Sequence, residues 1–182
     1  MTNMNTSCNV SPLSVFVPTP SNPWDAQKVR HLHNRIGFGI VPSELSRALF
    51  SSPEAYIDQL IDNALNLPPT QSPAWANLDP IDYPGNGFVY DEDQNEIYVE
   101  DTQYAFIQEL IEHGTRGRMT LFWHNLLVTR AVEYRFAGYA FRYFLALERN
   151  CLGNFKTFIH EIGLDEAMLK FLNGFENKVE HY

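Results

Sequence analysis

The stretch Met119-Thr120-Leu121-Phe122-Trp123-His124-Asn125 sets a histidine and an amide into a segment that otherwise has the pattern of a core helix. Thr120 and His124 stand four residues apart, so on a helix they form a short polar patch. The apolar positions form a broad stripe around that patch: Met119, Phe122, Trp123, Leu126 and Leu127. The pattern predicts a helix that begins near Thr115 and is buried along much of its circumference.

His124 is the first candidate functional residue, and Asn125 and Arg35 are the other candidates for a polar site. A histidine in such a place titrates near neutral pH, donates a hydrogen bond or binds a metal ion, so His124 is also the candidate metal ligand. A core histidine that is hydrogen-bonded to a neighbouring carbonyl or carboxylate is the simpler interpretation, and we favour it. Arg35 fits either the carboxyl end of a helix or a forked contact with a carboxylate, and the helix-end role is favoured.

The segments on either side of this stretch predict a mostly α protein, an irregular multi-helix bundle with one loop or β-hairpin excursion. Residues 1–23 carry four prolines among Ser, Thr and Asn, which predicts an extended arm. Residues 24–182 are expected to be the N-terminal part of a helical domain that is truncated at its end. Besides the helix near Thr115, helices are expected over residues 24–36, from 42, over 52–65, 102–114, 134–147, 154–163 and 165–172.

Capping residues mark several of these expected helix ends. Gly37 is expected to be a left-handed cap that ends the first helix. Ser52 and Asn154 are expected to accept hydrogen bonds at the amino ends of later helices, and Pro53 suits a first helical position, where a missing donor costs nothing.

The helical periodicity is interrupted at about residues 66–101. Residues 68–84 show no helical pattern, and Phe88-Val89-Tyr90 and Ile97-Tyr98-Val99 flank an acidic run at 91–96. This arrangement predicts a variable loop or β-hairpin. The acidic run alternates as a calcium-binding loop does, but it lacks the glycine and the bidentate glutamate that such a loop requires, so a solvated turn is predicted.

Composition limits the classes of partner. With 182 residues, of which 45% are hydrophobic, the chain is long enough to bury the core of one domain. Its 22 acidic and 13 basic side chains give a net charge of -9, which argues against nucleic acid and membrane surfaces as partners. Cys8 and Cys151 each lack a second cysteine nearby, which fits neither a disulfide framework nor a zinc site. No signal peptide is visible, so a cytoplasmic location is the default.

Two further groups of polar residues contain side chains of the kinds that bind metal ions. Glu109 and His113 have the four-residue spacing that two ligands on one helix would use, but a third ligand is missing and a solvated pair is favoured. His31 and His33 lie two residues apart on the first expected helix, so their side chains diverge and at most one of them joins a site.

Several short motifs occur in a fixed order along the chain: Pro23-Trp24, His31-Leu32, Arg35-Ile36-Gly37-Phe38-Gly39, the stretch 119–125, Leu152-Gly153-Asn154-Phe155, and Ala167-Met168-Leu169 followed by Asn173. Together they resemble the bacterial domain of unknown function 1800 family from about residue 23 to the end. Members usually continue well beyond this length, which implies that the chain is an N-terminal portion. Many relatives carry a second histidine two positions after the one that matches His124, and Leu126 stands there in this chain. That departure weakens a two-histidine metal site.

The family resemblance implies a fold and incompleteness but no activity and no cofactor. Relatives often occur beside sulfatase-like or phosphatase-like proteins and are often exported, which implies a partner role. The first functional hypothesis is therefore a helical scaffold or partner-binding module, whose partner is another protein or the missing C-terminal part of the same chain. The alternative is an enzyme with a polar or metal-assisted site around His124, to which Arg35 and Asn125 contribute and which residues beyond Tyr182 complete.

Overall fold

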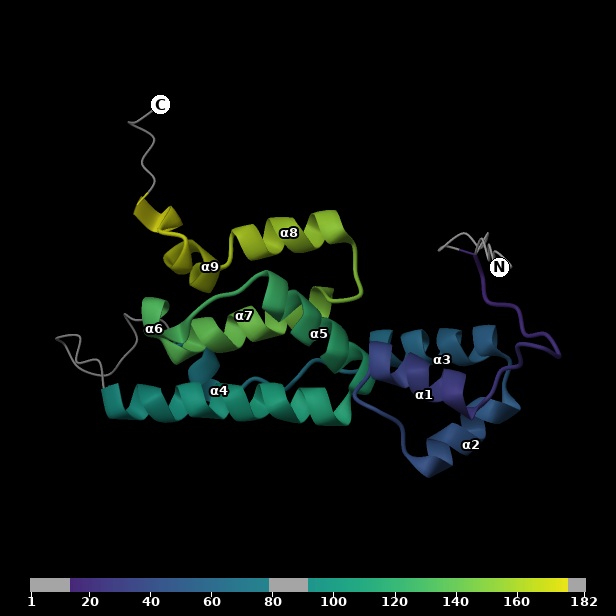
Figure 1. The fold of residues 1–182 in the computed structure, drawn as a ribbon. Coiled ribbons are helices and arrows are strands. Elements are labelled where there is room, and N and C mark those ends of the chain that lie inside the picture. The colour runs from purple at the N-terminus through teal and green to yellow at the C-terminus, as the bar shows by residue number, and fades with distance from the viewer. Residues whose placement is uncertain (1–13, 79–91, 177–182) are drawn as a thin grey trace, which may run out of the picture.

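Helices make up most of the part of the chain that the computed structural model describes, residues 14–78 and 92–176 (Figure 1). The α-helices are α1 (Ala26–Ile36), α2 (Pro42–Phe50), α3 (Pro53–Leu65), α4 (Glu92–Glu112), α5 (Gly114–Leu126), α6 (Ala131–Tyr134), α7 (Ala137–Asn150), α8 (Phe155–Gly163) and α9 (Glu166–Phe171), and the 3-10 helices are η1 (Ala74–Asn77) and η3 (Gly174–Glu176). No strand occurs in those two ranges. The expectation of a mostly α protein is confirmed.

Side-chain caps start several helices where the sequence predicts them. The Ser52 hydroxyl accepts a hydrogen bond from the Ala55 amide at the start of α3. The Asn154 side chain accepts one from the Thr157 amide at the start of α8, and the Asp165 carboxylate accepts from two amides of α9. Each cap accepts a hydrogen bond from an amide that has no partner within its own helix, so these helix starts can be predicted from the sequence.

The β-hairpin expected within residues 66–101 is wrong in its second half. Ile97, Tyr98 and Val99 lie inside α4, which begins at Glu92 rather than near Thr102. The first expected strand, residues 88–90, lies outside the described residues, whereas residues 66–78 are irregular apart from η1. The periodicity of apolar residues does not indicate helix α4, because its most buried side chains, Asn95, Thr102 and Glu109, are polar.

Two other helix boundaries differ from expectation. Gly37 follows α1 in an extended conformation with φ of -151°, and the left-handed residue of this turn is Gly39, with φ of 119°. The single helix expected over residues 134–147 is divided, because Arg135 adopts a left-handed conformation with φ of 62° and ends α6. Helix α7 then starts at Ala137 and continues to Asn150, further than expected.

Helix α7 is the centre of the main core. In Figure 1 it lies between α4 and α8, with α5 beside it, and it contacts α4, α5, α6, α8, α9 and η1. Its Tyr143, Ala146 and Leu147 pack with Phe158 and Ile162 of α8. The many aromatic residues on α7 are therefore explained by its neighbours on several sides.

A second, smaller core joins α1, α2 and α3. Val29, Ala48 and Tyr56 are completely buried there. Helix α5 connects this core to the main one, because both α1 and α3 contact it. Gly117 permits the close approach of α5 to α4, since a Cβ at this position would lie 2.8 Å from the Glu109 carbonyl oxygen.

Residues 14–23, before α1, are extended and exposed, with one isolated bridge between Thr19 and Asn22. The remainder of the expected arm, residues 1–13, lies outside the described residues.

Candidate functional site

His124 lies on α5 against the main core. Its ring meets Phe106 of α4 edge to face, with 5.2 Å between centroids, and lies 6.4 Å from the ring of Tyr143. It borders a pocket of about 190 Å³ whose walls are mostly apolar. Burial lowers the pKa of His124, so the imidazole is neutral at neutral pH.

The His124 pocket lacks the groups that would activate an imidazole. Its polar lining comes from Thr102, Gln103 and Thr129, and no carboxylate from the described residues lines it. A general base needs an orienting partner and a reacting group within reach. The neutral ring can donate or accept one hydrogen bond to a small ligand, and the surrounding aromatic side chains suit an apolar one.

Arg35 and Asn125 share a different pocket, of about 440 Å³, with Arg118 and several apolar residues of α5. Arg35 comes from the last turn of α1, as the helix-end interpretation expected. The structure therefore brings Arg35 and Asn125 together but places His124 in a separate pocket. Two guanidinium groups and one amide can bind an anionic or amide-bearing group.

Part of the apolar stripe expected on α5 is exposed. The side chain of Phe122 is 52% exposed and that of Leu126 is 62% exposed. The fully buried positions of this helix are Arg116, Gly117 and Thr120 instead. The prediction that this apolar stripe is buried is wrong for Phe122 and Leu126, whereas Trp123 and Leu127 of the same stripe are partly buried and pack against the main core.

Arg116 is the centre of a buried ionic network that the sequence analysis missed. Its Nε donates to Oε1 of Glu109 over 2.5 Å, and a second guanidinium nitrogen donates to Oε2 over 2.8 Å. The third nitrogen donates to the Pro68 carbonyl over 2.7 Å. The side chains of Arg116 and Glu109 are 6% and 1% exposed. This forked contact fixes the chain after α3 against α4 and α5.

Glu148 of α7 is the second carboxylate beside Arg116, at 3.6 Å from its guanidinium. One oxygen of Glu148 accepts from the Thr70 amide over 2.8 Å. Its Oε2 is buried and has no hydrogen-bond partner among the described residues. We name Glu109, Arg116 and Glu148 the Arg116 cluster. One cation thus serves two buried carboxylates.

Electrostatics keep the Glu109 carboxylate of the Arg116 cluster ionised. Burial by itself raises the pKa of Glu109, but hydrogen bonds from Arg116 and His113 overcome that effect and lower it. Cys151 lies beside the cluster, and its thiol contacts the Arg116 carbonyl oxygen. Burial raises the pKa of the Cys151 thiol, so this group stays protonated and acts as a small apolar side chain.

His113 links the Arg116 cluster to the surface. Its Nδ1 lies 2.6 Å from Oε2 of Glu109, and 28% of the side chain is exposed. The ring borders a pocket of about 390 Å³ to which His33 and Glu44 also contribute. A carboxylate that orients an imidazole in this way prepares its other nitrogen for proton transfer or for binding a metal ion.

His33 and His31 diverge as expected. His33 is buried, and its Nε2 lies 2.7 Å from the Tyr56 hydroxyl, which in turn donates to Glu44 over 2.7 Å. Because that hydroxyl hydrogen is directed at Glu44, Nε2 of His33 is the donor to Tyr56. His31 is exposed on the opposite side of α1.

No set of three or more His, Cys, Asp or Glu residues able to hold a metal ion occurs within the described part of the chain. The expected pair Glu109 and His113 is in contact, but Arg116 takes both oxygens of Glu109. Arg116 and Glu148 were missed because a charged residue in a helical pattern is ordinarily assigned to the surface. The available signal was the seven-residue spacing of Asn95, Thr102 and Glu109, which marks one line along α4.

Comparison with known proteins adds the following. The profile of a family described as "Protein of unknown function (DUF1800)" matches residues 31–182, which is well over half of the chain. No curated protein and no solved structure shows significant similarity to this chain. None of the described helices combines the length and the apolar character that crossing a membrane requires.

Proposed function

This chain belongs to the DUF1800 family, and from that premise we propose that it is a helical scaffold that binds a protein partner through an exposed aromatic face. The face consists of Phe122, Trp123 and Leu126 on α5 and Phe155 and Ile159 on α8. The single observation that carries the proposal is the exposure of large apolar side chains on two adjacent helices, with Phe155 59% and Phe122 52% exposed.

The aromatic face is a rigid surface. Trp123 donates its indole N–H to the Cys151 carbonyl over 2.9 Å, which fixes the ring. Phe155 stacks on Trp123 with 5.6 Å between centroids and 26° between planes, and Phe122 meets it edge to face at 5.0 Å. Ordered aromatic rings lose little conformational freedom on binding, which favours them as anchors of protein interfaces.

Exposed apolar area carries a free-energy cost that a partner removes. Burial of such area contributes about 25 cal/mol per Å². Contiguous exposed patches of this kind, with charged groups at the edge, are typical of protein interaction sites. Arg35 and Arg118 supply such charges, since they share a pocket with Phe122 and Leu126.

The polar sites favour a structural role for the domain. The His124 pocket has no carboxylate from the described residues, and the side chains of Arg116 and Glu109 are buried and paired with each other. An enzyme centred on His124 would require activating groups from elsewhere.

Photo-crosslinking in the source cells tests the proposal. We expect p-benzoylphenylalanine in place of Phe155 to capture one defined protein, and the same group in place of Phe50, which is 93% exposed on α2, to capture none. Phe122→Ser should reduce the Phe155 crosslink strongly without changing the circular dichroism spectrum. Identical products from both positions, or no product from Phe155, would refute the proposal. A crosslink to further residues of the same polypeptide would show that the face is an internal interface.

The scaffold and enzyme hypotheses predict different effects of replacing His124. If the domain is a scaffold, His124→Ala lowers stability or partner capture and abolishes no turnover. Substrate conversion that is lost in a folded His124→Ala variant would overturn the scaffold role.

A further inference from the structure

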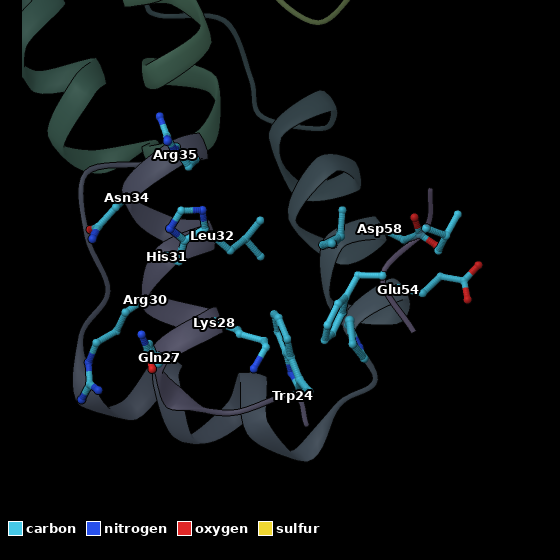
Figure 2. Close-up of a pocket in the computed structure, with 14 residues that line it drawn as sticks. Trp24, Gln27, Lys28, Arg30, His31, Leu32, Asn34, Arg35, Glu54 and Asp58 are labelled. Carbon is cyan, nitrogen blue, oxygen red and sulfur yellow. The ribbon is translucent and has the colours of Figure 1, made fainter. Parts of the chain in front are cut away.

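A groove of about 1090 Å³ lies between α1 and α3, and of its lining residues Arg35 also lines the pocket beside Phe122. The extended residues before α1 contribute Val15 and Phe16 to it. Figure 2 shows basic side chains on α1 and the acidic side chains of Glu54 and Asp58 on α3, with Trp24 beside Lys28 in between. We name this the α1–α3 groove.

One side of the α1–α3 groove is basic. Lys28, His31 and Arg35 follow each other at three- and four-residue spacings, so they share one face of α1. His31 and Arg35 are exposed, and neither makes an ion pair with any residue in the described ranges. Lys28 is paired with Asp25 at 3.3 Å. In a chain with a net charge of -9, Arg35 is an exposed cation without a carboxylate partner among the described residues, and it is available to an anionic ligand.

The floor of the groove is apolar and ordered. Trp24 donates its indole N–H to the Ala48 carbonyl over 3.0 Å, which fixes the ring. Phe16 lies 6.3 Å from that ring, and Leu32 and Ile57 line the groove from the two helices. A fixed aromatic ring beside the free guanidinium of Arg35 suits a ligand that combines apolar and anionic groups.

The acidic side of the groove limits the negative charge of a ligand that can bind there. Glu54 and Asp58 are exposed on α3 and repel a second row of anions. The groove therefore does not suit a polyanion. A ligand with acidic groups along one edge can direct those groups toward α1 and away from α3. This charge arrangement also disfavours a basic ligand on the α1 side.

We propose that the α1–α3 groove binds an extended peptide segment in which acidic residues alternate with apolar ones. Lys28 and Arg35 are seven residues apart on α1, which corresponds to roughly 10 Å, or about three residues of extended chain. The groove volume exceeds the roughly 300–1,000 Å³ of ordinary small-molecule pockets. Arg35 also lines the pocket beside Phe122, so the two sites share this residue, whereas His31 and Trp24 line only the groove and Phe122 lines only the other pocket.

Peptide selection tests the proposal with a defined probe. A random decapeptide phage library is panned on the complete chain and depleted on the His31→Ala/Arg35→Gln double variant. We expect the enriched peptides to contain Asp or Glu together with apolar residues. Enrichment of basic peptides, or no enrichment over the double variant, would overturn the proposal.

Binding of the selected peptide is then measured by fluorescence polarisation. We expect Arg35→Gln to weaken affinity about tenfold, because a charge-assisted contact is lost. Arg130→Gln removes the same charge from an exposed position outside the groove and should leave affinity unchanged. Phe122→Ser should also leave it unchanged, which separates this site from the aromatic face. Equal affinity of wild type and Arg35→Gln, or a dimer of the chain that Arg35→Gln dissociates, would contradict a peptide site.

Discussion

Replacing Arg116 by methionine removes the only cation that contacts both carboxylates of the Arg116 cluster in the described structure, while it keeps an unbranched apolar stem in the same space. The hydrogen bonds lost include two to Glu109 at 2.5 and 2.8 Å, and two to the carbonyls of Pro68 and Leu67 at 2.7 and 3.2 Å. Glu109 and Glu148, whose side chains are each 1% exposed, then lose the guanidinium that contacts them both.

The expected loss of stability follows from burial rather than from a sum of contacts. Removing one partner of a buried ion pair costs about 3–5 kcal/mol, because the remaining charge stays buried without compensation. For a domain of this size that corresponds to a fall in Tm of about 6–20 °C. An exposed pair is a fair contrast: Arg130 and Glu133, at 64% and 47% exposure, should contribute about 0–1 kcal/mol.

Urea unfolding followed by circular dichroism at pH 7 measures both free energies, with Arg130→Met as the control. A loss of less than about 1 kcal/mol for Arg116→Met, or a loss equal to that of the control, would refute the reasoning. The triple variant Arg116→Met/Glu109→Gln/Glu148→Gln removes all three charges and should recover much of the loss. Failure of that rescue would show that packing, not charge, explains the effect.

The pH dependence supplies an independent check. The pKa of Glu109 is lowered in the folded protein, so its contribution to stability is complete above the ordinary glutamate pKa and is lost as the pH falls through the folded value. In Arg116→Met burial is no longer opposed by the guanidinium, so the pKa of Glu109 should rise. The difference in unfolding free energy between wild type and variant should therefore shrink as the pH falls from 7 to 4.

Three further results are expected. Gly117→Ala should destabilise the protein by about 1–3 kcal/mol because its Cβ would lie 2.8 Å from backbone atoms of α4, whereas Gly163→Ala, with open space around it, should not; thermal melts of the two variants compare them directly. Asn95→Ala should cost about 1–3 kcal/mol in urea unfolding, since the Asn95 amide joins the carbonyl of Arg135 to the amide of Ala137, and a neutral result would show that this bridge is dispensable. Because burial lowers the pKa of His124, the contribution of this residue to stability is lost as the pH falls below about 6.5. The unfolding free energy of His124→Phe should therefore fall less than that of wild type between pH 7 and 5. Parallel plots of unfolding free energy against pH for the two proteins would exclude titration of this ring.

The parts of the fold that the sequence predicts are those with local causes. Ser52, Asn154 and Asp165 cap helices through bonds to amides two or three residues away, and such contacts depend on no distant segment. The helical character of residues 92–101 could not be predicted, because Asn95 is buried by a distant partner, the turn between α6 and α7. Tertiary contact, not local preference, decides that segment.

The candidate sites divide in the same way. The placement of Arg35 at the end of α1 and the divergence of His31 from His33 follow from helical spacing. The separation of His124 from Asn125 and Arg35 also follows from spacing, since adjacent residues on a helix point about 100° apart. The Arg116 cluster needed coordinates, because Glu148 meets Arg116 only when α7 packs on α5.

The α1–α3 core and the α7 core have no buried residue in common. The smaller one has three completely buried side chains, so its opening exposes far less apolar area than global unfolding does. Deuterium should therefore enter the amides of α1 to α3 well before those of α7, in two kinetic steps. A protein built in this way can release its first three helices and keep the remainder of its architecture intact.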